Sequence, residues 1–137
     1  MTDAELLNAF TDFVNTAWMI FTAYVSIVFA YLVAGYLISN KLGSKMVLLV
    51  SSIYTLVAVW AIFAINTNLQ SISAAASEIR RVVREGESSL GWLPVVNVPQ
   101  FLDSAIPIVV TLITIGAYAG SIVFFFYQRK YNSDNGT

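Results

Sequence analysis

Side chains that could carry acid–base or metal chemistry are few and scattered in this sequence. Of its 137 residues eight are acidic and seven are lysine or arginine, and it has neither histidine nor cysteine. Cysteine-ligated zinc and iron–sulfur sites are therefore ruled out, and ordinary haem ligation has no histidine to use. No Ser-His-Asp, HExxH, Walker or dinucleotide pattern brings the remaining groups together. We expect no catalytic, cofactor-binding or metal site, and no enzyme activity.

Three long stretches of the chain contain no charged residue: residues 13–39, 46–77 and 104–128. About 20 apolar residues are enough for a helix to cross the hydrocarbon core of a bilayer. Hydrophobic residues make up 58% of the sequence and charged ones 11%, whereas soluble domains have about 25% charged residues. The sequence therefore predicts an all-α integral membrane protein with three transmembrane helices in one membrane domain, residues 1–137.

Charged residues, N-cap residues and proline or glycine indicate where the predicted helices begin and end. Thr2 or Asp3 is a suitable N-cap for the first helix, and the acidic N-terminus lacks the positive region of a signal peptide. Asp103 or Ser104 is expected to cap the third helix, with Pro107 in its first turn. The predicted elements are transmembrane helices at about 13–39, 46–66 and 104–128, an extension of the second helix to about residue 85, an outer loop at 86–103 and a disordered tail at 129–137.

The second helix is expected to continue beyond the membrane. Neither proline nor glycine occurs between residues 46 and 85, and forty helical residues would be about 60 Å long, roughly twice the hydrocarbon thickness. Apolar residues recur there at alternating steps of three and four, the pattern of a coiled-coil seam. The residues of this seam are Ile62, Ile65, Leu69, Ile72, Ala76, Ile79 and Val83.

The loop after this helix is too apolar to remain in water. Gly86 should end the helix, and Gly91, Pro94 and Pro99 prevent another from forming at once. Three interpretations stay open: the loop folds back over the heptad seam, the seam pairs with a second copy or partner, or the helix lies flat with Trp92 inserted among the lipid headgroups. The candidate outer interaction face comprises Leu69, Ile72, Ala76, Ile79, Val83 and Trp92.

Small residues predict close helix packing within the membrane. Gly116 and Gly120 form a GxxxG pattern in the third helix, which allows another backbone to approach closely. These patterns could pack the three helices of one chain together, or form a contact with a second copy or a partner subunit. The first helix repeats small residues at Ser26, Ala30 and Ala34, and the second has a weaker stripe at Ser51, Thr55 and Ala58.

Lysine and arginine near the ends of the spans predict the orientation, because they accumulate on the cytoplasmic side. Lys41 and Lys45 mark the first connection as cytoplasmic, and Arg129 and Lys130 mark the C-terminus in the same way. We expect a multi-pass protein of a bacterial inner membrane with its N-terminus outside. The arginines at 80, 81 and 84 count against this orientation, although acids accompany them.

These features favour a small non-catalytic accessory or scaffold subunit. Its expected partners are the lipid bilayer and either another membrane protein or a second copy; a net charge of −1 gives no surface for nucleic acid. An alternative is a homo-oligomeric pore, since three crossings with the N-terminus outside resemble the general plan of phage class I holins. The long second loop and the weakly charged tail depart from that plan. A third hypothesis is a small membrane sensor or regulator.

Overall fold

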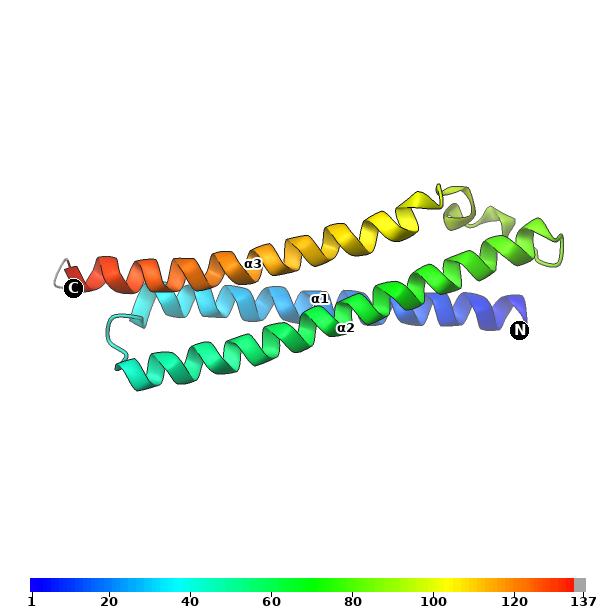
Figure 1. The fold of residues 1–137 in the computed structure, drawn as a ribbon. Helices are drawn as coiled ribbons and strands as arrows, with labels where there is room; N and C mark the ends of the chain where they lie inside the picture. The colour runs from blue at the N-terminus through cyan, green and yellow to red at the C-terminus, as the bar shows by residue number, and fades with distance from the viewer. Residues whose placement is uncertain (135–137) are drawn as a thin grey trace. The chain divides into compact units, whose positions relative to one another are not determined.

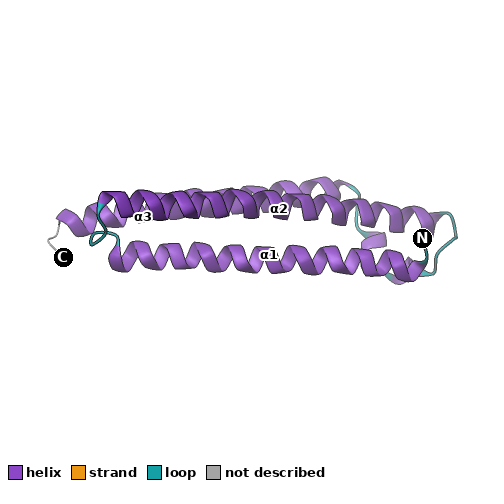
Figure 2. Cartoon of the chain, turned by 90° about the horizontal axis from the view of Figure 1, so that it is seen from below, coloured by secondary structure: helices purple, strands orange, loops and turns teal. Residues whose placement is uncertain are grey.

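The protein is built almost entirely from three long helices. The computed structural model describes residues 1–134, with α1 at Asp3–Ile38, α2 at Ser44–Arg84 and α3 at Phe101–Asp134 (Figure 1). Two short 3-10 helices, η1 at Leu90–Trp92 and η2 at Pro94–Asn97, interrupt the loop between α2 and α3. The described residues include no strand (Figure 2). Each long helix is apolar and long enough to cross a membrane, so the predicted all-α class with three candidate spans is confirmed.

The helix ends at Thr2 and Gly86 follow the sequence prediction. The backbone N–H of Thr2 donates to the Glu5 carboxylate at 2.7 Å, and the Glu5 N–H donates to the Thr2 hydroxyl at 3.3 Å, which together form a capping box. Gly86 has a φ of 74°, and its N–H donates to the Val83 carbonyl at 3.1 Å. With the bond from Glu87 N–H to the Val82 carbonyl at 3.0 Å, this is a Schellman motif.

The two ends of α3 differ from the prediction. The helix begins at Phe101 instead of residue 104, because the N–H groups of Leu102 and Asp103 already donate to the carbonyls of Pro99 and Gln100. It then continues to Asp134, so the predicted disorder is wrong for residues 129–134, and the ring of Tyr131 stacks on that of Tyr127 one turn earlier. The rest of the predicted tail, residues 135–137, lies outside the described residues.

Contacts within the chain define two compact units, and every long helix contributes to both. Unit 1 comprises residues 1–20 and 64–111, and unit 2 comprises residues 21–63 with the chain from residue 112 onward. The sequence did not indicate this division, because each uncharged stretch passes through it without a break.

The core of unit 1 confirms that the loop folds back over the heptad seam. Ile79 of α2 and Leu90 of the loop are buried together with Leu6 of α1. Loop residues pack against this cluster, so the apolar loop and the apolar helix face shield each other from water. The partly buried residues around it are Phe10, Val82, Val83, Leu93, Val95 and Val96.

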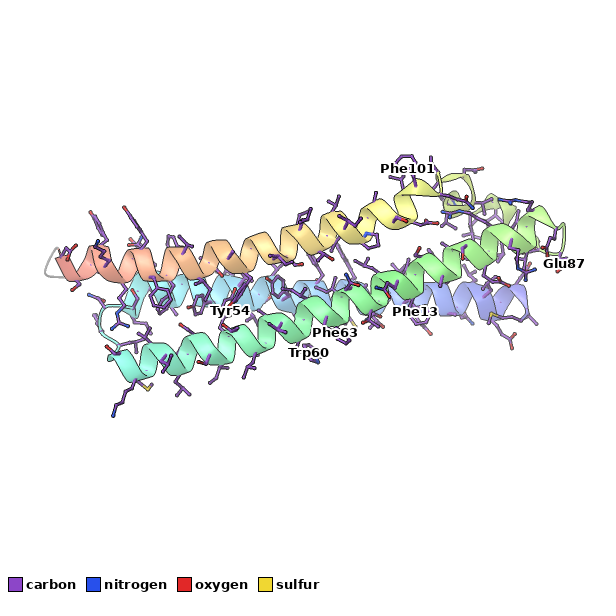
Figure 3. The ribbon with its side chains drawn as sticks, in the orientation of Figure 1. Phe13, Tyr54, Trp60, Phe63, Glu87 and Phe101 are labelled. Atoms are coloured by element: carbon purple, nitrogen blue, oxygen red, sulfur yellow. The ribbon has the colours of Figure 1, made fainter. Side chains whose placement is uncertain are left out.

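The core of unit 2 is aromatic. The rings of Tyr31 and Tyr54 stack with their centroids 4.0 Å apart. The ring of Phe125 also stacks with that of Tyr31, at a centroid distance of 4.7 Å. Tyr54 points into this core, whereas Trp60 and Phe63, farther along α2, point away from it (Figure 3). One ring from each long helix therefore fixes the packing of the unit.

Candidate functional site

A buried ion pair joins α2 to the beginning of α3 in unit 1. Both terminal nitrogens of the Arg80 guanidinium donate to the Asp103 carboxylate, Nη2 to Oδ1 at 3.1 Å, and Nε donates to the Val95 carbonyl at 3.0 Å. The side chains are only 6% and 21% exposed. A buried guanidinium is tolerated when such bidentate bonds compensate for its lost hydration. Since Val95 belongs to η2, Arg80 ties three segments of the chain together.

Pro107 gives α2 a second contact with α3. Because proline has no N–H, the carbonyl four residues earlier in the helix, that of Asp103, loses its usual donor. The hydroxyl of Ser73 donates to this carbonyl at 3.5 Å. The early start of α3 therefore moves Pro107 out of the predicted first turn and makes Asp103 a contact point rather than a cap.

An apolar hollow of about 420 Å³ lies beside the ion pair. Its volume is within the range of about 300–1,000 Å³ that is usual for small-molecule sites. Arg80 and Asp103 are the charged residues of its lining. The apolar lining comes from all segments of unit 1 and includes Phe10, Leu69, Ile72, Ala76, Val98 and Leu102.

A second hollow, of about 440 Å³, shares Ser73, Asp103 and Pro107 with the apolar one. The rest of its lining is more polar and includes Gln70, Ser77 and Ser104. The two hollows therefore meet at a common wall, one offering hydrocarbon contacts and the other hydroxyl and amide groups. We call them the apolar hollow and the polar hollow.

The residues of the predicted outer face have different environments. Ala76 and Ile79 are buried inside unit 1, which removes them from the surface offered to a partner. Leu69 and Ile72 line the apolar hollow, and Val83 packs against the loop. Trp92 is 69% exposed and does not join this core. The structure therefore brings five of the six residues together, as the covered seam of unit 1.

The small residues predicted for helix packing divide into two groups. Gly116 and Gly120 are exposed, and a Cβ built at either glycine would meet no atom within 4 Å. Ser26 and Ala30 are also exposed, and Ala34 is half-buried. The interpretation that the GxxxG face packs against other helices of this chain is therefore wrong in this structure.

The weaker stripe of α2 does pack inside the chain. Ala58 is buried, the Ser51 hydroxyl shares a hydrogen bond with Tyr31 at 2.9 Å, and Thr55 shares one with Tyr118 at the same distance. Two further tyrosines bond across unit 2: Tyr54 shares a 2.6 Å bond with Ser121, and Tyr24 donates to the Thr114 carbonyl at 2.6 Å. These hydroxyls find their partners on other helices of the chain, as an apolar environment requires.

The close helix approach in unit 2 occurs at Gly35. A Cβ at this position would lie 3.0 Å from Cδ2 and 3.2 Å from Cα of Phe125. Since the second atom belongs to the backbone of α3, a rotamer change could not make room. Gly35 therefore allows the Phe125 ring to enter the aromatic core.

Some other ionisable side chains of unit 1 make hydrogen bonds and ion pairs near the surface. Arg81 bridges Glu78 at 2.6 Å and Glu85 at 2.7 Å, and its bond with Glu78 lowers the pKa of that carboxyl and raises the pKa of Arg81. Asp3 accepts bonds from the N–H and hydroxyl of Ser89, both at 2.9 Å. The Ser88 and Ser89 bonds lower the pKa of Asp3. Within residues 1–134 no group of three acids could hold a metal ion.

The chain matches no protein-family model, no curated protein and no solved structure.

Sequence reasoning missed the parts played by Arg80, Asp103 and Gly35. Arg80 entered that reasoning only as evidence on the orientation, yet this residue lies four residues after Ala76 and three before Val83, on the flank of the heptad seam. That spacing was the available signal. Gly35 has no comparable signal, because it is one of many small residues in an apolar helix.

Proposed function

We propose that this protein is a non-catalytic, multi-pass membrane subunit that binds another membrane protein through the GxxxG face of α3. The observation that carries the proposal is the exposure of Gly116 and Gly120, with open space where their side chains would be. In a bilayer, small residues of this kind allow a second helix to approach and gain van der Waals contact. In the part of the chain that the structure describes, no other helix fills the space beside these glycines.

The side chains around this face suit a helix partner in lipid. Leu112, Ile113 and Val123 lie within a turn of the glycines and are 64%, 57% and 68% exposed. Such residues form ridges on either side of a shallow groove, which another transmembrane helix can fill. The face contains no charge, so a partner helix need not supply a counter-ion.

A homo-oligomeric pore is the weaker alternative. A water-filled channel needs polar groups on the surface that surrounds it, but the hydroxyls of Tyr31, Tyr54 and Tyr118 are bonded within the chain. The large exposed residues of the same helices are mainly apolar, which favours contact with lipid or with a partner helix.

We also propose the orientation, with the N-terminus and the loop between α2 and α3 outside and the C-terminus in the cytoplasm of a bacterium. The first turns of α1, the second half of α2, the loop and Asp103 contain seven acids and three arginines. Near the α1–α2 turn and the end of α3 there are four basic residues and one acid, Asp134. The basic excess belongs on the cytoplasmic side.

Co-purification tests the subunit proposal. The protein is extracted in a mild detergent from its own membrane, and its native mass and companion chains are determined. In the double variant Gly116→Leu with Gly120→Leu, branched side chains fill the groove, so we expect the companion chain to be lost by about tenfold or more.

The control is Ala23→Leu, which adds a branched side chain at an exposed position of α1. This control should keep the companion. Equal retention of the companion by the double variant and the control would disprove the role of the GxxxG face, and a protein that is always monomeric would disprove the subunit function.

A further inference from the structure

The apolar and polar hollows of unit 1 together have the two-sided chemistry of an amphiphile site. A ligand that crosses their shared wall at Ser73 and Asp103 would have hydrocarbon contacts on one side and hydrogen-bonding groups on the other. The volumes of about 420 and 440 Å³ are each sufficient for a chain segment and a small head. We propose that this double hollow binds one membrane lipid whose uncharged head carries hydroxyl groups.

The balanced charge of the wall that the two hollows share favours an uncharged lipid head. Arg80 is 6% exposed and its charge is matched by Asp103 in a bidentate pair, so neither hollow offers an unbalanced cation to a phosphate or carboxylate. The other polar groups there are the Gln70 amide and serine hydroxyls. The hydroxyls of Ser73 and Ser77 already donate within the chain, at 3.5 and 2.8 Å, but their oxygens can still accept hydrogen bonds from the hydroxyls of glycerol or sugar heads.

The position of the two hollows along α2 and α3 supports a lipid as the occupant. The uncharged stretch of α2 ends at Ser77, and that of α3 begins at Ser104, so both helices change from apolar to charged at the two hollows. Such a change marks the depth where hydrocarbon gives way to lipid headgroups. Leu69 and Ile106, on the apolar side of this change, line the apolar hollow, and Arg80 lines it on the charged side.

This inference does not depend on the proposed protein partner. The hollows lie in unit 1, whereas Gly116 and Gly120 belong to unit 2. Loss of the companion chain and loss of lipid binding can therefore be measured separately, with different variants.

The test uses the full chain in phosphatidylcholine nanodiscs and a monoacylglycerol with a photoreactive diazirine in its acyl chain. After illumination, peptide mass spectrometry locates the adducts. We expect adducts at Ile72, Val98 and Leu102, and protection of these sites by an excess of unlabelled monoacylglycerol. A fatty acid of the same chain length should protect at least about tenfold less well, because its carboxylate finds no free cation.

The variant Ala76→Phe is designed to block the apolar hollow. Ala76 lines this hollow, and an aromatic ring at that position would occupy it. We expect its adducts at Val98 to fall by about tenfold. Thr67→Phe is the control, with the same new side chain at an exposed position that lines neither hollow. It should keep the adducts, and far-ultraviolet circular dichroism verifies that both variants are folded.

Three results would overturn the proposal. The first is labelling spread evenly over the exposed apolar residues, without protection by the unlabelled lipid. The second is stronger protection by the fatty acid, which would refute the uncharged head. The third is unchanged labelling of Val98 in a folded Ala76→Phe variant.

Discussion

At the scale of single residues, the glycines of this protein have opposite roles. Gly35 leaves room for the Phe125 ring and backbone, whereas Gly116 and Gly120 adjoin open space. All three lie in long apolar helices, and their sequence neighbourhoods do not distinguish them. The GxxxG spacing singled out the two glycines at which a Cβ would meet no atom of residues 1–134 within 4 Å, so small-residue spacing alone did not predict which faces meet.

Replacing Gly35 by alanine should therefore destabilise the protein. The added Cβ would lie 3.2 Å from the Phe125 Cα, and one of the two helices must move. Overpacking costs about 1–3 kcal/mol, and the higher helix propensity of alanine offsets about 1 kcal/mol of it, so we expect a net loss of up to about 2 kcal/mol.

Thermal unfolding in detergent measures this loss, with Gly116→Ala as the matched control. A Cβ meets nothing at Gly116, so the control should be as stable as the parent or slightly more stable. If both variants unfold at the same temperature, the tight contact at Gly35 does not limit stability.

At the scale of elements, sequence patterns predicted what depends on local chemistry. The predicted N-cap at Thr2 and the predicted helix end at Gly86 need only neighbouring residues, and both are present. Of the three interpretations of the heptad seam, the structure supports the one in which the loop covers it. The start of α3 and the burial of Arg80 depend on contacts between segments far apart in the sequence, which periodicity cannot reveal.

One such contact joins the beginning of α1 to the loop between α2 and α3, and its strength should depend on pH. The Asp3 carboxylate accepts bonds from Ser88 and Ser89, which lower its pKa from 3.8. A group with a lowered folded pKa contributes its full stabilisation above the unfolded value and loses it as the pH falls through the folded value. The contact should therefore be intact at neutral pH and loosen below pH 3.8.

The variant Asp3→Asn tests this contact, because its neutral amide accepts weaker hydrogen bonds. We expect several-fold faster hydrogen exchange of the segment 86–93 at neutral pH, and little further loosening on acidification. Exchange followed by mass spectrometry, corrected for the intrinsic rate at each pH, measures both effects. Asp12→Asn, an exposed carboxylate on the same helix, is the control; an equal change in that variant would argue against a specific role for Asp3.

At the scale of the whole molecule, helix length and charge placement bear on the membrane topology. α2 has 41 residues and a length of about 60 Å, compared with a hydrocarbon core of about 30 Å. Its uncharged part ends at Ser77, and the ion pairs of Arg80 and Arg81 follow. The bilayer can therefore enclose only part of α2, and the remaining part needs the cover that α1 and the loop give it within unit 1.

The absence of cysteine from the sequence makes the proposed topology directly testable. Single-cysteine variants at exposed positions, Glu87→Cys in the loop and Ser133→Cys near the end of α3, are treated in intact spheroplasts with a membrane-impermeant maleimide. If the basic ends of the spans are cytoplasmic, Glu87→Cys should react at once and Ser133→Cys only after lysis. Lys45→Cys should behave like Ser133→Cys, because both lie on the basic side. The reverse pattern would show that the arginines of α2 outweigh the four basic residues near the turn and the C-terminus.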